Sequence, residues 1–408
     1  METFVLVVFL AVYAGMALGR WPGLRIDRTG IALLGAIALW AAGVFDGPAA
    51  LAAIDFPTLF VLAGLMVLSA QFDACGFYAW CSDRIARSAV SPRLILALTI
   101  AVAGVLAAVL ANDVVVFAMA PMLCRGLLER GLDPRPFLIG LAGAANAGSA
   151  ATVIGNPQNI LIGQVLELDF WRFAVFCAPP AVVALVLVWA GVAWPWRGAL
   201  AERGRAAPAE PPPLDRLGLA KAVFATALLL AGFASPMAPE EAVLLVAGYL
   251  LVSRRLATRQ LLGLVDWHLL VLFAGLFLVT ASLAATGLPG ELMAVLSGAG
   301  LGPDRLAVLA PLALVGSNTI GNVPVVMLLV QIVERLPEHV GYALAVLSTF
   351  AGNLLIVGSF ANIITVERAR EAGVELGFAV HARSGVPMTL LSLAAALAWF
   401  TWLGTVGW

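Results

Sequence analysis

Charged side chains are scarce in this sequence. Asp, Glu, Lys and Arg make up 12% of its 408 residues and apolar residues make up 62%, whereas soluble domains contain about 25% charged and about 45–50% apolar residues. A soluble fold of this length could not hide so much apolar surface, because faces in contact with water need charge. The charges fall in short clusters between long apolar stretches, as expected when lipid is the solvent. We therefore expect an all-α integral membrane protein.

Cysteines and catalytic motifs are also few. The four cysteines form no CxxC pair, which excludes the usual patterns of a zinc site or a disulfide framework. Phosphate-binding loops, HExxH motifs and nucleic-acid patches are absent, and an intramembrane enzyme would need a nucleophile or a metal cluster within the bilayer. We expect no enzyme activity, no cofactor, no metal cofactor site and no nucleic-acid partner.

The apolar stretches differ in length. A spanning helix needs about 20 residues, so the chain has room for roughly ten to twelve crossings. Three stretches, 114–123, 306–315 and 323–333, are much shorter than that. Their length suits the arms of re-entrant hairpins, which we place around 94–124 and 305–334. Broken helices are expected at 137–166 and 342–366, and a last helix at 386–406.

Arginine and lysine indicate the orientation. If the short stretches form hairpins, every basic residue except Arg172, Arg305 and Arg335 falls on one face. The positive-inside rule makes this face cytoplasmic. We expect a multi-pass protein of a bacterial-type cytoplasmic (inner) membrane, in contact with membrane lipid, with both termini periplasmic or extracellular.

The sequence contains an internal repeat. Asp55 and the following Ala-Gly-Leu at 63–65 match Asp266 and the Ala-Gly-Leu at 274–276. Asn112 similarly matches Asn318, and Gly155 matches Gly358, with order kept and spacing nearly so. A Pro-rich linker, 197–216, separates the halves 1–196 and 217–408. The predicted topology makes the two halves inverted, an architecture typical of secondary transporters and less typical of pores.

Polar residues interrupt the apolar segments at matching places in the two halves. Each freed backbone group is costly in lipid, so such interruptions survive where they line a polar cavity or where neighbouring helices stabilise a kink. Their symmetric pairing favours a functional site. We predict substrate binding by Asn112, Asn156, Asn159, Ser317, Asn318, Thr319, Ser359 and Asn362, and cation coupling by Asp113, Gly155, Asn156, Asn318 and Gly358.

Asp113 is the only acidic residue predicted at membrane depth. Such a residue is a functional candidate, because an ionised carboxylate is expensive in lipid. It could accept a proton, ligate a cation or balance a substrate. The structural alternative is that it caps the second arm of the hairpin, and both roles can coexist.

With these hairpins and breaks, residues 55–370 resemble the ion transporter superfamily, which includes divalent anion/sodium symporters, citrate transporters, arsenite efflux permeases and sodium/proton antiporters. Ser317-Asn318-Thr319 is similar to the Ser-Asn-Thr signature of dicarboxylate symporters, which contacts Na⁺ and a substrate carboxylate. The resemblance implies about eleven transmembrane helices in two inverted repeats, homodimerisation through a scaffold region, and an elevator-like motion. Asn112-Asp113-Val114 and the segment 155–159 look closer to the arsenite-permease and uncharacterised anion-permease branches.

These observations predict a secondary transporter that moves a small anion, such as a carboxylate or an inorganic oxyanion, coupled to Na⁺ or H⁺ by symport or antiport. Two other functions remain open at this point. One is an arsenite-type efflux permease, and the other is a Na⁺/H⁺ antiporter in which Asp113 titrates.

Overall fold

The computed structural model describes residues 1–19, 21, 23–202, 204, 212–332, 336–404 and 406–407. In these residues the chain forms twenty α-helices and two short 3-10 turns. The first half contains α1 (Glu2–Leu18), α2 (Arg28–Ala41), α3 (Gly47–Ala53), α4 (Phe56–Ala74), α5 (Phe77–Ala86), α6 (Pro92–Val109), α7 (Asn112–Glu129), α8 (Arg135–Ser149), α9 (Pro157–Val165) and α10 (Phe170–Ala193). The second half contains α11 (Arg216–Phe233), α12 (Pro239–Leu251), α13 (Thr258–Leu262), α14 (Trp267–Ala284), α15 (Leu288–Gly298), α16 (Leu306–Thr319), α17 (Asn322–Ile332), α18 (Glu338–Ala351), α19 (Phe360–Glu371) and α20 (Phe378–Leu403).

Corresponding helices in the two halves begin in the same way. The Asp55 carboxylate accepts a hydrogen bond from the Thr58 amide at 3.1 Å where α4 begins, and Asp266 accepts one from the Leu269 amide at 3.0 Å where α14 begins. An acceptor at this position satisfies an amide that has no partner within the helix. The matching aspartates in the sequence are therefore matching helix caps.

Glycine allows close packing at one pair of equivalent helix crossings. A Cβ atom on Gly64 of α4 would lie 2.3 Å from the Val243 side chain of α12, and one on Gly275 of α14 would lie 3.0 Å from the Ala32 backbone of α2. Small residues let helix backbones approach closely in membrane proteins. The repeated Ala-Gly-Leu sequence thus marks α4 on α12 and α14 on α2, the same crossing made twice.

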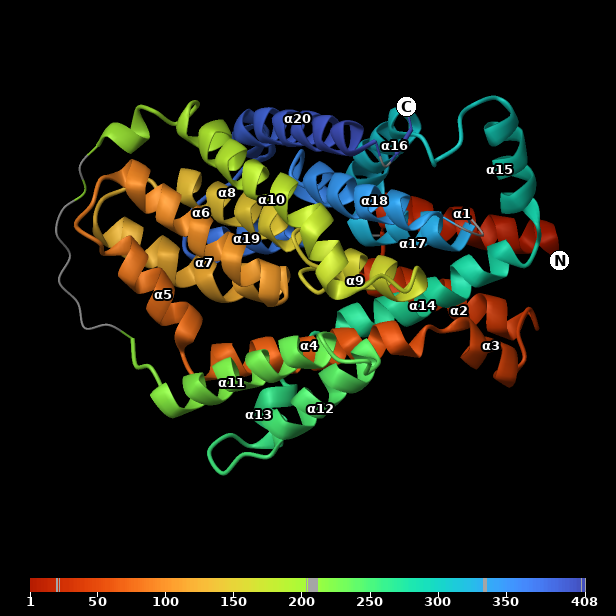
Figure 1. The fold of residues 1–408 in the computed structure, drawn as a ribbon, viewed down its shortest axis with the longest axis horizontal. Coiled ribbons are helices and arrows are strands. Elements are labelled where there is room, and N and C mark those ends of the chain that lie inside the picture. The colour runs from red at the N-terminus through yellow and green to blue at the C-terminus, as the bar shows by residue number, and fades with distance from the viewer. Residues whose placement is uncertain are drawn as a thin grey trace.

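The helices gather in two groups. The first helix group comprises α1, α2, α4, α11, α12 and α14, in which α2 packs on α14 and α12 packs on α4 and α11. The second helix group comprises α6–α10 and α16–α20, held together by contacts such as α6 with α8 and α10 with α20. Figure 1 shows α4, α11 and α12 along its lower edge and α8, α10 and α20 above them. The two groups meet where α4 touches α7 and α9 and where α14 touches α17.

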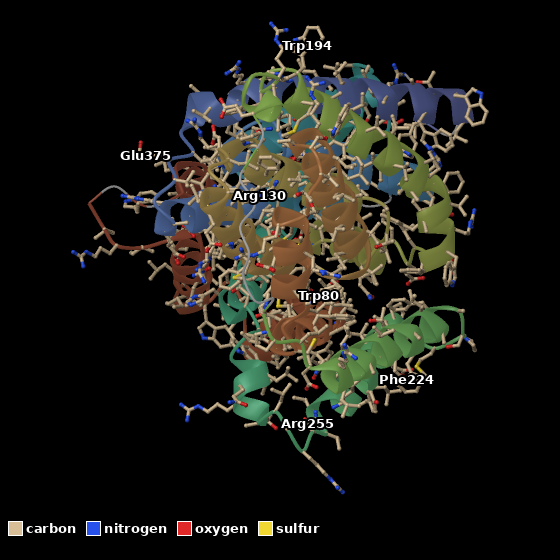
Figure 2. All side chains as sticks on the ribbon, turned by 90° about the vertical axis from the view of Figure 1, so that its left-hand side faces the viewer. Trp80, Arg130, Trp194, Phe224, Arg255 and Glu375 are labelled. Carbon is tan, nitrogen blue, oxygen red and sulfur yellow. The ribbon has the colours of Figure 1, made fainter. Side chains whose placement is uncertain are left out.

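The surface of the helices suits lipid. Within the described residues, six helices are long and apolar enough to span a bilayer, namely α4, α6, α10, α11, α14 and α20, and shorter apolar helices accompany them. Only 17% of α11 is buried inside the protein. Its Phe224 side chain lies on the outer surface (Figure 2). The chain is an all-helical, multi-pass membrane protein, while the expected number of eleven crossings stays a prediction.

Some helix bounds differ from those predicted. The second arm of the first hairpin, α7, has 18 residues, because the helix continues beyond the apolar stretch 114–123 through Arg125 to Glu129. Helix α20 begins at Phe378 rather than at 386, since the polar residues before Pro387 are helical too. Parts of the predicted linker (203 and 205–211), the end of the second hairpin (333–335) and residue 405 lie outside the described residues.

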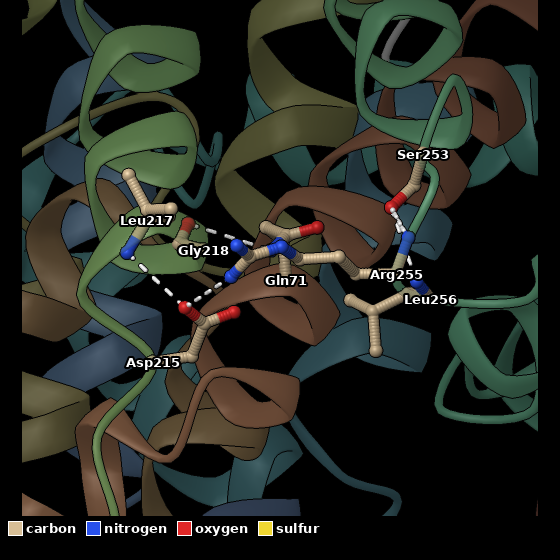
Figure 3. A network of polar contacts seen from close by, with 7 residues as sticks. All are labelled: Gln71, Asp215, Leu217, Gly218, Ser253, Arg255 and Leu256. Carbon is tan, nitrogen blue, oxygen red and sulfur yellow. Dashed lines mark hydrogen bonds and ion pairs between the residues drawn. The ribbon is translucent and has the colours of Figure 1, made fainter.

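A polar corner attaches the start of the second half to the end of α4 (Figure 3). Asp215 accepts a hydrogen bond from the Leu217 amide at 3.1 Å and pairs with the Arg255 guanidinium at 3.2 Å. The Gln71 side chain of α4 donates to the Gly218 carbonyl at 3.4 Å. These contacts join α4, α11 and the loop after α12.

Candidate functional site

The first broken helix is organised by two asparagines. Helix α8 ends at Ser149 and α9 begins at Pro157, and the Asn156 side chain caps α9 by accepting from the Asn159 amide at 2.8 Å. The Asn159 side-chain amide donates to the carbonyls of Ser149 at 3.2 Å and Thr152 at 2.9 Å. One side chain thus satisfies carbonyls that the interrupted helix leaves free, as a break at membrane depth requires.

The second broken helix repeats this arrangement. Ser359 caps α19 by accepting from the Ala361 amide at 3.2 Å. The Asn362 side-chain amide donates to the carbonyls of Gly352 at 2.8 Å and Leu355 at 3.0 Å. Asn362, Gly352 and Leu355 stand at the same spacing as Asn159, Ser149 and Thr152, so the two breaks are equivalent in their hydrogen bonding.

Both breaks contain a glycine in close contact with its surroundings. A Cβ atom on Gly155 would lie 2.2 Å from the Ser149 carbonyl oxygen. On Gly358 it would lie 2.5 Å from the Asn318 side-chain oxygen and 2.8 Å from the Gly352 carbonyl oxygen. Approaches under 3 Å leave no room for a side chain, which explains the shared glycine.

The hairpin tips contact the breaks. The backbone N–H of Asn112 donates to the Gly155 carbonyl at 3.2 Å. In the second half, the Asn318 side chain donates to the Ala351 carbonyl at 2.8 Å and accepts from the Leu355 amide at 3.2 Å. The Ser317 hydroxyl lies 3.4 Å from the Ser348 carbonyl. Thr319 differs, because it is exposed and its hydroxyl bonds back to its own helix.

The structure corrects the pairing of the two tips. The sequence match paired Asn112 with Asn318, but Asn112 begins α7 whereas Asn318 lies in the last turn of α16. The residue that begins α17 is Asn322. Asn322, which is 7% exposed, is therefore the structural counterpart of Asn112.

A buried asparagine links the two halves. The side-chain oxygen of Asn146 accepts from the side-chain amide of Asn112 at 3.2 Å and from the Ser359 hydroxyl at 2.9 Å. The side-chain amide of Asn146 donates to the side-chain oxygen of Asn353 at 2.8 Å. His381 lies 3.2 Å from the Asn353 carbonyl. Asn146 and Asn353 were not predicted as site residues, although an asparagine inside an Ala- and Gly-rich apolar segment carries the same signal as those that were.

Four asparagine oxygens at the site are buried and accept no hydrogen bond from the described residues. They are the side-chain oxygens of Asn112 and Asn322 at the tips and of Asn159 and Asn362 at the breaks. A buried acceptor without a donor is costly. Amide and carbonyl oxygens are the ligands that hard cations prefer, so each tip and break together form a half-site suited to a cation.

The first half-site adjoins an acidic cavity. This cavity of about 250 Å³ lies between the two helix groups and is lined by Asp73, Asp113, Asp266 and Asn156 among mostly apolar residues, and its described lining contains no basic side chain. Asp113 lies in the first turn of α7, and no side chain caps this helix, so the capping alternative for Asp113 is wrong. Val323 occupies the corresponding place after Asn322, and the negative charge is thus confined to the first half-site.

A helical membrane protein with two equivalent half-sites, each built from a hairpin tip and a broken helix, belongs to the class of secondary transporters. A family model described as citrate transporter (CitMHS) matches residues 5–345, and the chain belongs to this family. It is therefore a membrane transporter and not an enzyme.

Known proteins agree with this assignment. An uncharacterised transporter of Mycobacterium tuberculosis is 29% identical over 99% of both chains. The inner membrane protein YbiR of Escherichia coli is 31% identical over 83% of this chain and 86% of its own, and the silicon efflux transporter LSI3 of rice is 28% identical over 92% and 93%. The YdaH transporter of Alcanivorax borkumensis shares the fold, with a TM-score of 0.60 and 16% identity over 99% of this chain and 98% of its own.

Proposed function

We propose that this protein moves a small anion, a carboxylate or an inorganic oxyanion, across the bacterial cytoplasmic membrane, coupled to Na⁺ or H⁺. The observation that carries the proposal is the pair of equivalent half-sites, in which Asn159 and Asn362 make the same hydrogen bonds at two helix breaks. Half-helix N-termini favour an anion and free oxygens favour a cation. Each half-site offers both kinds of group.

The coupling ion binds in the first half-site in this proposal. Asp113 supplies the negative charge, and the free oxygens of Asn112 and Asn159 supply neutral ligands. A bound Na⁺ or a proton on Asp113 would each neutralise the carboxylate. The predicted cation-coupling roles of Gly155, Asn318 and Gly358 remain part of this proposal, and all three residues make close contacts at the breaks.

The two helix groups suggest how access alternates. The second helix group carries both half-sites, and the cavity beside Asp113 lies at its boundary with the first group. We infer that the second group moves as a body against the first, an elevator-like motion of two inverted repeats, with the first group forming the homodimer scaffold. The termini outside the cytoplasm remain part of the proposal, and the inner membrane location of the relative YbiR supports the membrane assigned.

The two alternative functions are an arsenite-type efflux permease and a Na⁺/H⁺ antiporter. Three carboxylates line one cavity in the described structure without a basic partner, an arrangement that suits cation or proton exchange. The rice relative is named a silicon efflux transporter. In the antiporter Asp113 titrates, whereas in the efflux permease the exported species is a small uncharged or oxyanionic acid.

Transport by purified protein in proteoliposomes tests these proposals. Uptake of labelled citrate, succinate, sulfate and arsenite would be measured under imposed Na⁺ or proton gradients, with Asp113→Asn as the uncoupled variant and the surface variant Asp215→Asn as its control. Saturable counterflow of one anion supports the first proposal. Cation exchange without any anion requirement supports antiport, and the absence of both would overturn the function proposed here.

A further inference from the structure

We propose that Arg28, at the start of α2, binds the negative charge of the transported anion at the tip of the second hairpin. The inference rests on the proposed anion transport and adds its recognition residue. Arg28 belongs to the first helix group, whereas the hairpin tip belongs to the second. The anion would therefore be held between the two groups.

Arg28 is buried against the second half-site. The residue is only 9% exposed. Its guanidinium carbon lies 5.7 Å from the centre of the Phe360 ring. Its Nη1 atom lies 3.9 Å from the place of a Cβ on Gly321, the residue at the hairpin tip. The guanidinium thus reaches both the tip and the broken helix of the second half.

The positive charge of Arg28 has no acidic partner among the described residues. Its Nε atom donates to the Met16 carbonyl at 3.2 Å, and no ion pair of Arg28 is formed within this part of the chain. The neighbouring Asp27 is used to cap α2, accepting from the Gly30 amide at 2.9 Å. A buried charge is costly unless it is paired, so the two terminal nitrogens are available for an anion.

Two helices begin near Arg28. Helix α17 begins at Asn322, directly after Gly321, and α19 begins at Phe360. Gly321 has φ +100°, a conformation that glycine adopts readily and that keeps the backbone of the tip free of a side chain. The positive ends of two helix dipoles and a guanidinium together favour a carboxylate or a tetrahedral oxyanion, which an arginine can bind with two parallel hydrogen bonds.

The charges of the two half-sites are opposite. Ala32 of α2 contacts Gly275 and Val243 of α12 contacts the equivalent Gly64, so Ala32 and Val243 are equivalent positions. Arg28 stands four residues before Ala32, and its counterpart four residues before Val243 is Pro239. The first half-site therefore has Asp113 and no arginine from α12, and the second has Arg28 and no acid at Val323. This asymmetry assigns the coupling cation to the first half-site and the anion to the second.

The test compares anion affinity in three variants reconstituted in proteoliposomes. Uptake kinetics of citrate, succinate and sulfate would be measured for wild type, Arg28→Gln and Arg28→Lys, with Arg25→Gln as the control, since Arg25 is exposed in the same loop. We expect Arg28→Gln to raise KM about ten- to a hundred-fold, the usual loss for one charge-assisted hydrogen bond, and more for a dianion than for a monoanion. Arg28→Lys keeps the charge, so its KM should rise less, and kcat should change little in both.

Three results separate failure of this inference from failure of the proposed function. Wild type that transports none of the anions would overturn both. Anion uptake with an unchanged KM in Arg28→Gln would overturn the role of Arg28 alone, as would a fall in kcat and thermal midpoint without a change in KM.

Thermal unfolding of the purified variants, with and without the three anions, provides the folding check: the anions should stabilise wild type and Arg25→Gln but not Arg28→Gln. If Arg28→Gln does not fold, the KM and anion stabilisation of Arg28→Lys decide in the same way.

Discussion

Removing the side-chain amide at either helix break should destabilise the protein by the same amount. In wild type, Asn159 donates to two carbonyls at 3.2 and 2.9 Å, and Asn362 donates to the equivalent two at 2.8 and 3.0 Å. Hydrogen bonds between helices in membranes contribute about 0.6 and at most about 1.7 kcal/mol each. Asn159→Ala and Asn362→Ala should therefore each lower the free energy of unfolding by about 1–3 kcal/mol.

The same variants test the proposed cation site in the first half-site. A cation present at ten times its Kd stabilises a one-site protein by about 1.4 kcal/mol. If Na⁺ is the coupling ion, Asn159→Ala should lose this increment, because it removes a free side-chain oxygen at the first half-site, whereas Asn362→Ala should keep it.

The assay is equilibrium unfolding in mixed micelles, in sodium chloride and in choline chloride at equal ionic strength. Thr226→Ala is the matched control, since the Thr226 hydroxyl bonds only to the Ala222 carbonyl of its own helix among the described residues, and it should change little. Equal stability of wild type and both variants would refute the hydrogen-bond argument. In choline chloride, a loss of unfolding free energy confined to one variant would refute the equivalence of the two breaks.

Three further predictions concern coupling, packing and orientation. Asp113→Asn keeps the shape of the side chain but removes its charge, so anion binding should persist while uptake loses its response to an imposed cation gradient; uptake still driven by the gradient would contradict this. Gly155→Ala places a Cβ 2.2 Å from the Ser149 carbonyl oxygen and should abolish uptake and cost about 1–3 kcal/mol, whereas Gly290→Ala, with nothing within 4 Å, should leave uptake and thermal midpoint unchanged. In intact cells, a membrane-impermeant thiol reagent should label Glu240→Cys but not Arg255→Cys, and labelling of both would reverse or break the proposed topology.

The amino-acid sequence alone determined that the chain lies in a membrane and where its helices are interrupted. Lipid acts on each segment separately: it selects apolar side chains along a helix and makes every polar interruption costly. Gly155, Asn159, Gly358 and Asn362 could therefore be chosen as candidate site residues without knowledge of the fold. The family followed from the same motifs.

The ends of helices were less predictable from apolar length. Helix α7 continues to Glu129, where Arg87, the residue directly after α5, pairs with the Glu129 carboxylate at 2.7 Å. A helix can leave the apolar stretch and continue wherever such partners satisfy its charged residues. Counting apolar residues along the chain does not reveal these partners.

Only the tertiary structure decided which polar residues meet. Asn146 joins the first hairpin to the second broken helix. Asn322 rather than Asn318 corresponds to Asn112. Arg28, which follows a basic loop in the sequence, lies against Phe360. These residues are far apart in the sequence, and their contacts depend on how whole helices pack. The sequence shows where a polar group would be costly to bury. The hydrogen-bond partner that offsets this cost belongs to another helix, and only the packing of the helices brings the two groups together.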